Sequence, residues 1–166
     1  MAGVRLEPVD PKHVPALADD EAAPPDGLPK GEALAEATAR LGARLGELQT
    51  RLTAEGERAV LVVLQGRDAS GKDGTVKHVF DACNPFGLRV TSFKAPSPEE
   101  RAHDYLWRVH AQCPPRGTIG IFNRSHYEDV LAVRVHGLAP EATWRRRYRH
   151  IAEFERMLAD EGTRVL

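Results

Sequence analysis

An apolar run that leads into a glycine-bounded polar loop constrains this chain more than any other feature. Residues 60–64 are all apolar, the loop spans 66–71, and Lys72 follows it. A Gly-x-x-x-x-Gly-Lys order after a strand and before a helix is typical of a loop that binds phosphate through its backbone N–H groups. Gly66 and Gly71 allow backbone angles that a Cβ would penalise. The stretch predicts an α/β protein with a phosphate site, and an ordinary strand-to-helix turn is the alternative.

Two acidic residues distinguish this loop from the common pattern. The residue after the lysine is usually Ser or Thr, whose hydroxyl binds Mg²⁺, but here it is Asp73, and Asp68 lies inside the loop. Two carboxylates would repel a polyanion unless a divalent cation lay between them. We therefore expect Asp68 and Asp73 to bind Mg²⁺, or Mn²⁺ in its place, and to orient an acceptor phosphate. For Asp73, an acid that complements the helix dipole is the competing interpretation.

The composition is that of one folded domain. The 166 residues are 42% hydrophobic and 28% charged, and the formal net charge of -1 gives no basic field that would indicate a nucleic acid partner. No apolar run approaches the roughly 18 residues of a membrane span, and the first residues lack a signal-peptide pattern. Cys83 and Cys113 lack metal-ligand spacing. Two reduced, buried thiols fit a cytoplasmic protein without a membrane partner.

The first third of the chain contains two different patterns. Residues 1–30 hold six prolines and scattered acids without a period, and we interpret them as an extended, Pro-rich N-terminal arm. Residues 31–56 carry leucines at 34, 41, 45, 48 and 52, which predicts an amphipathic helix. We expect its leucine face to pack on the body of the protein, and a self-association surface is the alternative. We also expect the protein to form homo-oligomers.

From residue 59 onward, strand and helix patterns alternate. Strands are predicted at 59–65, 88–93, 118–122 and 163–166, and helices at 73–83, 98–112, from 125, and at 140–160. A capping box, Ser97-Pro98-Glu99-Glu100, marks the start of the second of these helices. This alternation predicts a three-layer αβα fold, in which a parallel sheet has helices on both faces and ligands bind beyond the carboxyl ends of the strands. Because the last strand has only four residues, we expect the sheet to be C-terminally incomplete.

The third strand ends at a second group of polar residues, Asn-Arg-Ser-His-Tyr-Glu-Asp. Asn123 stands where phosphate-loop proteins usually have a metal-ordering Asp, and Arg124 can bind two phosphate oxygens at once. Glu128 and Asp129 follow one turn later, and we expect them to supply the acidic function that Asn123 lacks. A solvated helix start is the alternative for this pair. His126 lies beside an aromatic residue and is interpreted as structural.

These residues and further basic groups make up the predicted site. The predicted catalytic residues are Asp68, Lys72, Asp73 and Arg124, and the predicted metal ligands are Asp68, Asp73, Glu128 and Asp129. The residues expected to contact nucleotide or polyphosphate are Gly66, Arg67, Ala69, Ser70, Gly71, Gly74, Lys77, Lys94, Asn123 and Arg134. Four arginines, at 145, 146, 147 and 149, crowd the last helix. Such a run is usually a solvated surface, and a long polyanion is the alternative partner.

Three segments read Gly-Arg-Asp-Ala-Ser-Gly-Lys-Asp-Gly, Val-Thr-Ser-Phe-Lys-Ala-Pro and Phe-Asn-Arg-Ser-His-Tyr-Glu-Asp-Val-Leu. In this order and spacing they resemble the polyphosphate kinase 2 family over about residues 31–166, and the third is similar to its class III branch. The resemblance implies a thymidylate-kinase-like P-loop kinase domain, Mg²⁺, and phosphoryl transfer from inorganic polyphosphate to AMP and ADP, which gives ADP and ATP. It implies site roles for Asp68, Lys72, Asp73, Arg124, Glu128 and Asp129. Members of that family continue into a basic helical lid, so we expect the kinase domain at 31–166 to be partial.

The resemblance and the residues agree on the chemistry. Two anions must meet, and Lys72, Arg124 and a metal ion would offset their repulsion. A phosphate nucleophile is already ionised at neutral pH, so the reaction needs no strong general base. Two alternatives remain. One is an ATP-dependent small-molecule kinase of the same fold, which would normally have Ser or Thr at position 73 and Asp at position 123. The other is a non-catalytic fragment that binds polyphosphate or nucleotide.

Overall fold

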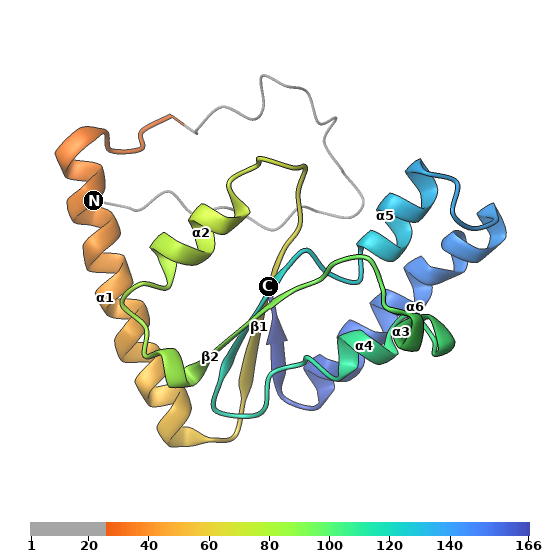
Figure 1. The fold of residues 1–166 in the computed structure, drawn as a ribbon. Helices are drawn as coiled ribbons and strands as arrows, with labels where there is room; N and C mark the ends of the chain where they lie inside the picture. The colour runs from red at the N-terminus through yellow and green to blue at the C-terminus, as the bar shows by residue number, and fades with distance from the viewer. Residues whose placement is uncertain (1–25) are drawn as a thin grey trace. The chain divides into compact units, whose positions relative to one another are not determined.

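The computed structural model describes residues 26–166 (Figure 1). The arm predicted over 1–30 therefore lies almost entirely outside the described residues. The chain divides into two compact units, 1–41 and 42–166. Helix α1 (Gly31–Glu55) begins in the first unit and ends in the second, and its bounds match the predicted helix closely. The sheet and the other helices belong to the second unit.

The second unit is built on a four-stranded parallel sheet with the order β2-β3-β1-β4. Leu64 and Ser92 both lie opposite Asn123, so the three neighbouring strands end at the same level. The segments that follow these strands therefore meet at one edge of the sheet. The strands are β1 (Ala59–Leu64), β2 (Leu88–Ser92), β3 (Ile119–Asn123) and β4 (Thr163–Val165).

Helices and a short 3-10 turn connect the strands. The long helix α6 returns the chain to the sheet, and Gly162, at φ 88°, makes the turn into β4. In the region 26–166, no helix combines the length and apolar character that a membrane crossing requires. The connecting elements are α2 (Lys72–Val79), η2 (Pro85–Gly87), α3 (Pro98–Ala102), α4 (Trp107–His110), α5 (Glu128–Val135) and α6 (Glu141–Asp160).

One face of the sheet packs against α4 and α6. Leu61 of β1 and Phe122 of β3 are fully buried there, in contact with a cluster that includes Val109 of α4 and Phe154 and Leu158 of α6. Alternate residues of a strand point to opposite faces, so this cluster uses every second strand position. Burial of such side chains stabilises the fold by about 1.5–3 kcal/mol each.

The other face packs against α2 and the second half of α1. Ile119 and Ile121 of β3 contact Phe80, which follows α2, while Leu45 and Leu52 of α1 cover the same cluster. Helices thus lie on both faces of the sheet (Figure 1), which confirms the predicted three-layer α/β fold. Two of the five leucines of α1 pack on the body as expected. The other three, Leu34, Leu41 and Leu48, are exposed.

Two predicted helices are shorter in the structure. The helix predicted over 98–112 begins at the predicted capping box but breaks into α3 and α4. His103 has an extended backbone, and the side chain of Asp104 accepts a hydrogen bond from the N–H of Leu106 (3.0 Å), so a turn replaces the helical ladder. The helix predicted over 73–83 ends at Val79, because the chain turns at Phe80 to bury that ring in the core.

Candidate functional site

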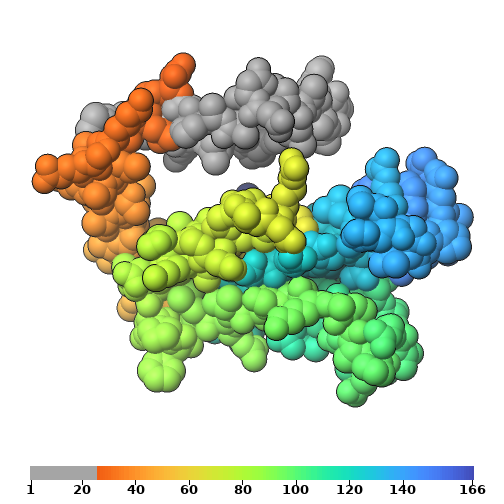
Figure 2. Space-filling model, turned by 45° about the horizontal axis from the view of Figure 1, so that its top comes forward, coloured from red at the N-terminus to blue at the C-terminus, as the bar shows by residue number. Residues whose placement is uncertain are grey.

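The loop between β1 and α2 has the backbone geometry of a tight anion-binding turn. Ala69 and Gly71 both have positive φ, 62° and 85°. Gly66 does not have a positive φ, which corrects the expectation for this residue, and a Cβ there would lie 2.7 Å from the Oγ of Ser70, a side-chain atom that can rotate away. Gly71 is the N-cap of α2, so the first N–H groups of the helix open toward the loop. Figure 2 shows the loop, in yellow, projecting from the molecular surface.

The side chain of Lys72 curls back into the loop. Its Nζ donates to the carbonyl oxygens of Gly66 (2.8 Å) and Arg67 (2.7 Å) and lies 3.3 Å from the Oγ of Ser70. The ammonium group is therefore held at the centre of the loop by oxygen acceptors. Phosphate oxygens are stronger acceptors of the same kind, so this position suits a bound phosphoryl group.

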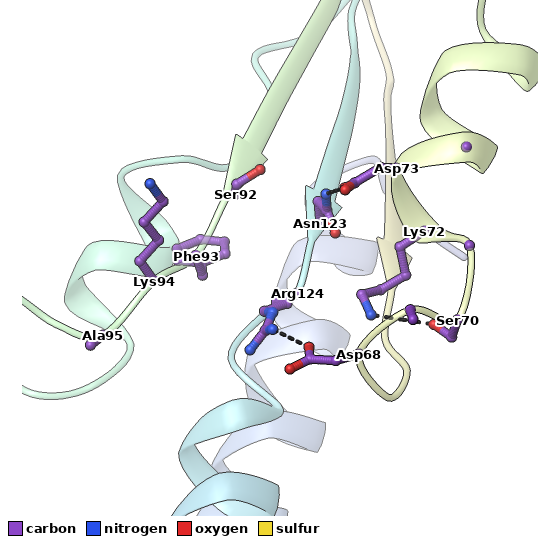
Figure 3. A pocket seen from close by; sticks show the side chains of 13 residues that line it. Asp68, Ser70, Lys72, Asp73, Ser92, Phe93, Lys94, Ala95, Asn123 and Arg124 are labelled. Atoms are coloured by element: carbon purple, nitrogen blue, oxygen red, sulfur yellow. Dashed lines mark hydrogen bonds and ion pairs between the residues drawn. The ribbon is translucent and has the colours of Figure 1, made fainter.

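The two acids of the loop each meet a polar side chain from the end of β3. Asp68 forms an ion pair with Arg124, and the Nδ2 of Asn123 donates to Asp73 at 2.5 Å (Figure 3). Arg124 adopts a positive φ of 61°, which is uncommon for a residue with a side chain. The side chain of Asp68 is 84% exposed and that of Arg124 is 42% exposed. These groups can therefore exchange their partners for a ligand.

The loop and the two strand ends enclose a cavity of about 660 Å³ that we call the loop cavity. Lys94, just after β2, also lines this cavity. Figure 3 shows the side chains of Lys72 and Arg124 close to Asp68, whereas the ammonium group of Lys94 points away from them. The cavity thus offers three cations and two carboxylates to a ligand. Its lining residues are Asp68, Ala69, Ser70, Gly71, Lys72, Asp73, Gly74, Ser92, Phe93, Lys94, Ala95, Asn123 and Arg124.

A second cavity, of about 830 Å³, adjoins the first, and Lys94 and Arg124 line both. Apolar side chains of α5 and of the following turn, including Val133 and Leu138, form part of its wall. Its cationic lining comprises Lys94, Arg101, Arg108, Arg124, Arg146 and Arg147. A pocket with apolar walls and convergent cations is suited to a molecule that has both a flat apolar part and phosphates.

Buried charges support the wall of this second cavity. Arg108 is only 8% exposed, donates to the carbonyl oxygen of Lys94 (2.8 Å) and lies 3.6 Å from Asp129 Oδ2. Arg147 donates to the backbone oxygen of Asp129 at 2.7 Å and stacks over the ring of Tyr105. Burial raises the pKa of Asp129, and the two arginines only partly offset this effect. Asp129 is thus an anchor for two arginines.

Glu128 is held by a hydrogen-bonded chain that starts at the end of β1. The Nε2 of Gln65 donates to Glu128 Oε1 at 2.7 Å, and the Oγ of Ser125 donates to Gln65 Oε1 at 3.1 Å. Glu128 lines the second cavity, like Asp129. The residue before the phosphate loop is therefore linked directly to the start of α5.

With this geometry in view, comparison with known proteins identifies the family. The family sequence model of polyphosphate kinase 2 (PPK2) matches residues 30–166. The chain belongs to the PPK2 family. A PPK2 structure from Arthrobacter aurescens TC1 superposes with a TM-score of 0.80 at 42% identity, over 92% of this chain and 56% of that chain. The parallel sheet with its phosphate loop is accordingly the P-loop kinase fold of PPK2 proteins.

Curated PPK2 relatives are similar over most of this chain. The AMP/ADP-polyphosphate phosphotransferase of Meiothermus ruber is 62% identical over 135 residues, which are 81% of this chain and 51% of that protein. The ADP-polyphosphate phosphotransferase of Rhodopseudomonas palustris is 47% identical over 135 residues, 74% of this chain and 47% of that protein. The chain therefore spans about half the length of the curated relatives it matches.

The structure brings most of the predicted PPK2 site residues together and separates a few. Gly66 and Arg67 supply carbonyl oxygens to Lys72. Lys77 and Arg134 line neither cavity, and the guanidinium of Arg134 lies over the ring of Trp144 instead. The predicted residues that line the loop cavity are Asp68, Ala69, Ser70, Gly71, Lys72, Asp73, Gly74, Lys94, Asn123 and Arg124.

The four predicted metal ligands do not gather in one place. Asp68 and Asp73 line the loop cavity, whereas Glu128 and Asp129 line the second cavity and are engaged by Gln65 and by arginines. Within residues 26–166, no group of three or more His, Cys, Asp or Glu side chains lies close enough to hold a metal ion by itself. A metal at the loop cavity would therefore need ligand oxygens besides the two loop carboxylates.

The arginine run on α6 divides by helix face. Arg145 pairs with Glu141 and Arg149 lies near Glu153, and all four side chains are exposed. Arg146 and Arg147 line the second cavity. The sequence places the run on several faces of the helix but does not indicate which of the arginines line a cavity.

Proposed function

We propose that this protein is a phosphotransferase that moves the terminal phosphoryl group between inorganic polyphosphate and nucleotides, converting AMP and ADP to ADP and ATP with Mg²⁺. The observation that carries this proposal is the pairing of the two loop carboxylates with Arg124 and Asn123 across a cavity that also contains Lys72. An ordinary kinase loop has a hydroxyl where Asp73 stands. The names of the relatives support the same reaction.

The residues of the loop cavity would act mainly through charge. An oxygen of the acceptor phosphate attacks the terminal phosphorus of polyphosphate, and the bond from that phosphorus to the next bridging oxygen breaks. Lys72 and the N–H groups at the start of α2 would hold the transferred group, while Arg124 would neutralise the charge that develops on its oxygens. Lys94 would hold the neighbouring phosphate, since it lines both cavities.

The donor set of the loop cavity fits a hard divalent cation, and PPK2 kinases generally need a divalent metal. The side chains of Asp68, Asp73 and Asn123 all offer oxygen atoms, the ligands that Mg²⁺ prefers. Mg²⁺ usually keeps several waters and is bound through one or two carboxylates and substrate phosphates, which suits a site with only two loop acids. When bound, the ion would offset the repulsion between the two phosphate chains. We assign Mg²⁺ to these residues.

The second cavity is the place we assign to the acceptor nucleotide. Its volume of about 830 Å³ and its partly apolar wall suit a nucleoside, and its opening toward Arg124 would bring the phosphates of AMP or ADP to the loop cavity. Glu128 and Asp129 would then shape the acceptor side, which modifies their predicted metal role. Cytoplasmic localisation, assembly into homo-oligomers and the absence of nucleic acid or membrane partners remain predictions from the sequence.

A nucleotide assay with polyphosphate as the sole phosphate donor tests this function. We expect the protein to convert AMP to ADP and then to ATP in the presence of Mg²⁺ and polyphosphate. Chromatography of the nucleotides measures these products. Lys72→Ala is expected to abolish most of the product. Arg58→Ala is the matched control, because Arg58 is an exposed cation just before β1 that pairs with Glu55 and lines neither cavity. Transfer only from ATP to a small acceptor would replace this proposal with the alternative kinase.

A further inference from the structure

Arg124 needs support to keep its conformation. Its φ of 61° is a left-handed angle that is unfavourable for a residue with a Cβ, so surrounding contacts must impose it. Its own N–H donates to the carbonyl oxygen of Leu64 at 3.1 Å, which ties it to β1. The next two residues, Ser125 and His126, are fully buried. The direction of the Arg124 side chain is thus set by a turn whose following residues, Ser125 and His126, are buried in the protein.

Glu155 of α6 holds that buried half. Its Oε1 accepts a hydrogen bond from the hydroxyl of Tyr127 at 2.8 Å and lies 3.1 Å from the Nε2 of His126. Hydrogen bonds from His126 and Tyr127 outweigh the opposing effect of burial, so the pKa of Glu155 lies below its usual value. An ionised carboxylate only accepts, so the shared proton belongs to His126 Nε2. Both contacts converge on one oxygen of one side chain.

The place of Glu155 separates its role from direct contact with substrate. It lines neither the loop cavity nor the second cavity. It lies on a different element from Arg124 and contacts the turn after β3 through His126 and Tyr127. The ring of His126 also packs edge-on against Phe154, the neighbour of Glu155 on α6. Helix α6 therefore contacts the turn through Glu155 and Phe154, while β1 contacts it through Leu64.

We propose that Glu155 is a positioning residue for phosphoryl transfer, which through His126 and Tyr127 keeps the turn after β3 in the conformation that directs Arg124 into the loop cavity. The expected effect on kcat rests on the proposed function. The effect on the conformation of Arg124 does not depend on which reaction the protein catalyses. A general structural role would destabilise the fold without acting through Arg124. The two roles differ in whether the effect of Glu155 depends on the presence of Arg124.

A double-mutant cycle between Glu155 and Arg124 makes this distinction. In the full-length enzyme, Glu155→Ala is expected to lower kcat about tenfold or more, because a small misplacement of a catalytic cation is costly. In an Arg124→Ala background the same change should lower kcat by less than about twofold. Glu155→Gln should restore most of the rate, since its amide oxygen can still accept both hydrogen bonds. Equal losses in the two backgrounds would overturn the proposal.

Two further variants guard against a trivial loss of folding. Glu153→Ala removes an exposed acid from the same helix and should leave kcat unchanged. Tyr127→Phe removes only the hydroxyl that donates to Glu155, and we expect a loss of kcat in the same direction as that of Glu155→Ala. If Glu155→Ala does not fold, the cycle is made with Tyr127→Phe, and additive losses again contradict the proposal.

A spectroscopic measurement separates this inference from the proposed function. The guanidinium N–H signals of Arg124 in a ¹H–¹⁵N spectrum recorded at low temperature report its ion pair with Asp68, which is made through Nη2, and they are assigned by their loss in Arg124→Lys. We expect Glu155→Ala and Tyr127→Phe to shift or broaden them, and Glu153→Ala to leave them in place. Unchanged signals in Tyr127→Phe and Glu155→Ala would refute the positioning role. If the wild type forms no nucleotide from polyphosphate, the function fails, and these signals still decide the role of Glu155.

Discussion

Two carboxylate–arginine groups of this PPK2 protein have similar chemistry and opposite surroundings. At the loop cavity, Asp68 and Arg124 are 84% and 42% exposed. On the wall of the second cavity, Asp129 is 14% exposed, and its partners Arg108 and Arg147 are 8% and 19% exposed. The first pair is surrounded by solvent and the second by packed side chains.

This difference in burial separates binding from support. An exposed ion pair contributes about 0–1 kcal/mol to stability, so the Asp68–Arg124 pair can open for a ligand at little cost. Removing one member of a buried pair leaves an unpaired charge in the interior, which is strongly destabilising. In the sequence, Asp68 and Asp129 both are acids of a polar motif that follows a strand. Their surroundings in the structure suit Asp68 to ligand binding and Asp129 to holding arginines in place.

The largest effect that tests this comparison is on stability. Asp129→Ala should lower the free energy of unfolding by about 1–3 kcal/mol, because Arg108 and Arg147 lose a carboxylate while Arg108 keeps Glu100 and Arg147 keeps the backbone oxygen of residue 129. Asp68→Ala should lower it by less than about 0.5 kcal/mol. Urea unfolding followed by circular dichroism measures both. Similar losses in the two variants would contradict the division between a binding acid and a supporting acid.

The next effect is on turnover. Lys72→Ala should lower kcat at least about a hundredfold, since a preorganised charge at the transferred group is worth several kcal/mol. The hydrogen bonds of Lys72 lie within the loop, so the fold should persist. Steady-state rates with polyphosphate and AMP, together with a melting curve, measure the two quantities. A variant that unfolds, or that keeps a near-normal rate, would contradict the assignment.

The sequence predicted the sheet because strand and helix patterns are local, and the residues predicted for the phosphate loop lie together for the same reason. An apolar run before Gly66 and polar residues after Phe122 predict strand ends, and parallel strands bring those ends together. The break of the helix predicted over 98–112 was missed, since the hydrogen bond of Asp104 to the backbone competes with a strong helical pattern. Periodicity alone cannot weigh such a local contact.

The supporting residues were harder to predict because they act across the fold. Arg108 lies among apolar residues in the sequence, and this pattern could have indicated a buried arginine. Its partner Asp129 is distant in sequence, so the pair could not be predicted from local patterns. Gln65 and Glu155 carry no motif of their own, and their roles depend on long-range contacts with Glu128 and with the turn after β3. A sequence motif identifies residues that contact a ligand more readily than it identifies the residues that hold those side chains in place.

A smaller effect concerns Asp73, the second exposed acid of the loop. If Asp73 binds metal, Asp73→Asn should raise the Mg²⁺ concentration for half-maximal rate several-fold, because a neutral ligand binds Mg²⁺ less strongly. If it serves only the helix dipole, the change should cost about 0.3–1 kcal/mol of stability and leave the metal titration unchanged. Asp73→Ser restores the usual hydroxyl and should keep metal binding but lose rate with polyphosphate. Unchanged kinetics in both variants would make Asp73 a capping residue.

The smallest effect concerns pH, and it contrasts two partly buried acids, Asp129 and Glu155. Burial raises the pKa of Asp129 above its ordinary 3.8, so the folded protein binds the proton more tightly than the unfolded chain. The contribution of Asp129 to stability should therefore fall as the pH rises from about 3.8 through the raised pKa.

Glu155 should show the opposite slope. Burial opposes its ionisation, but hydrogen bonds from His126 and Tyr127 bring its pKa below the ordinary 4.5. Its contribution is therefore present above pH 4.5 and is lost as the pH falls through the lowered pKa. Unfolding free energies of wild type, Asp129→Asn and Glu155→Gln between about pH 3 and 7 give both slopes by difference. Slopes of the same sign would show that the carboxylate of Glu155 is not held by its two donors, and that the contact of α6 with the turn after β3 does not require its charge.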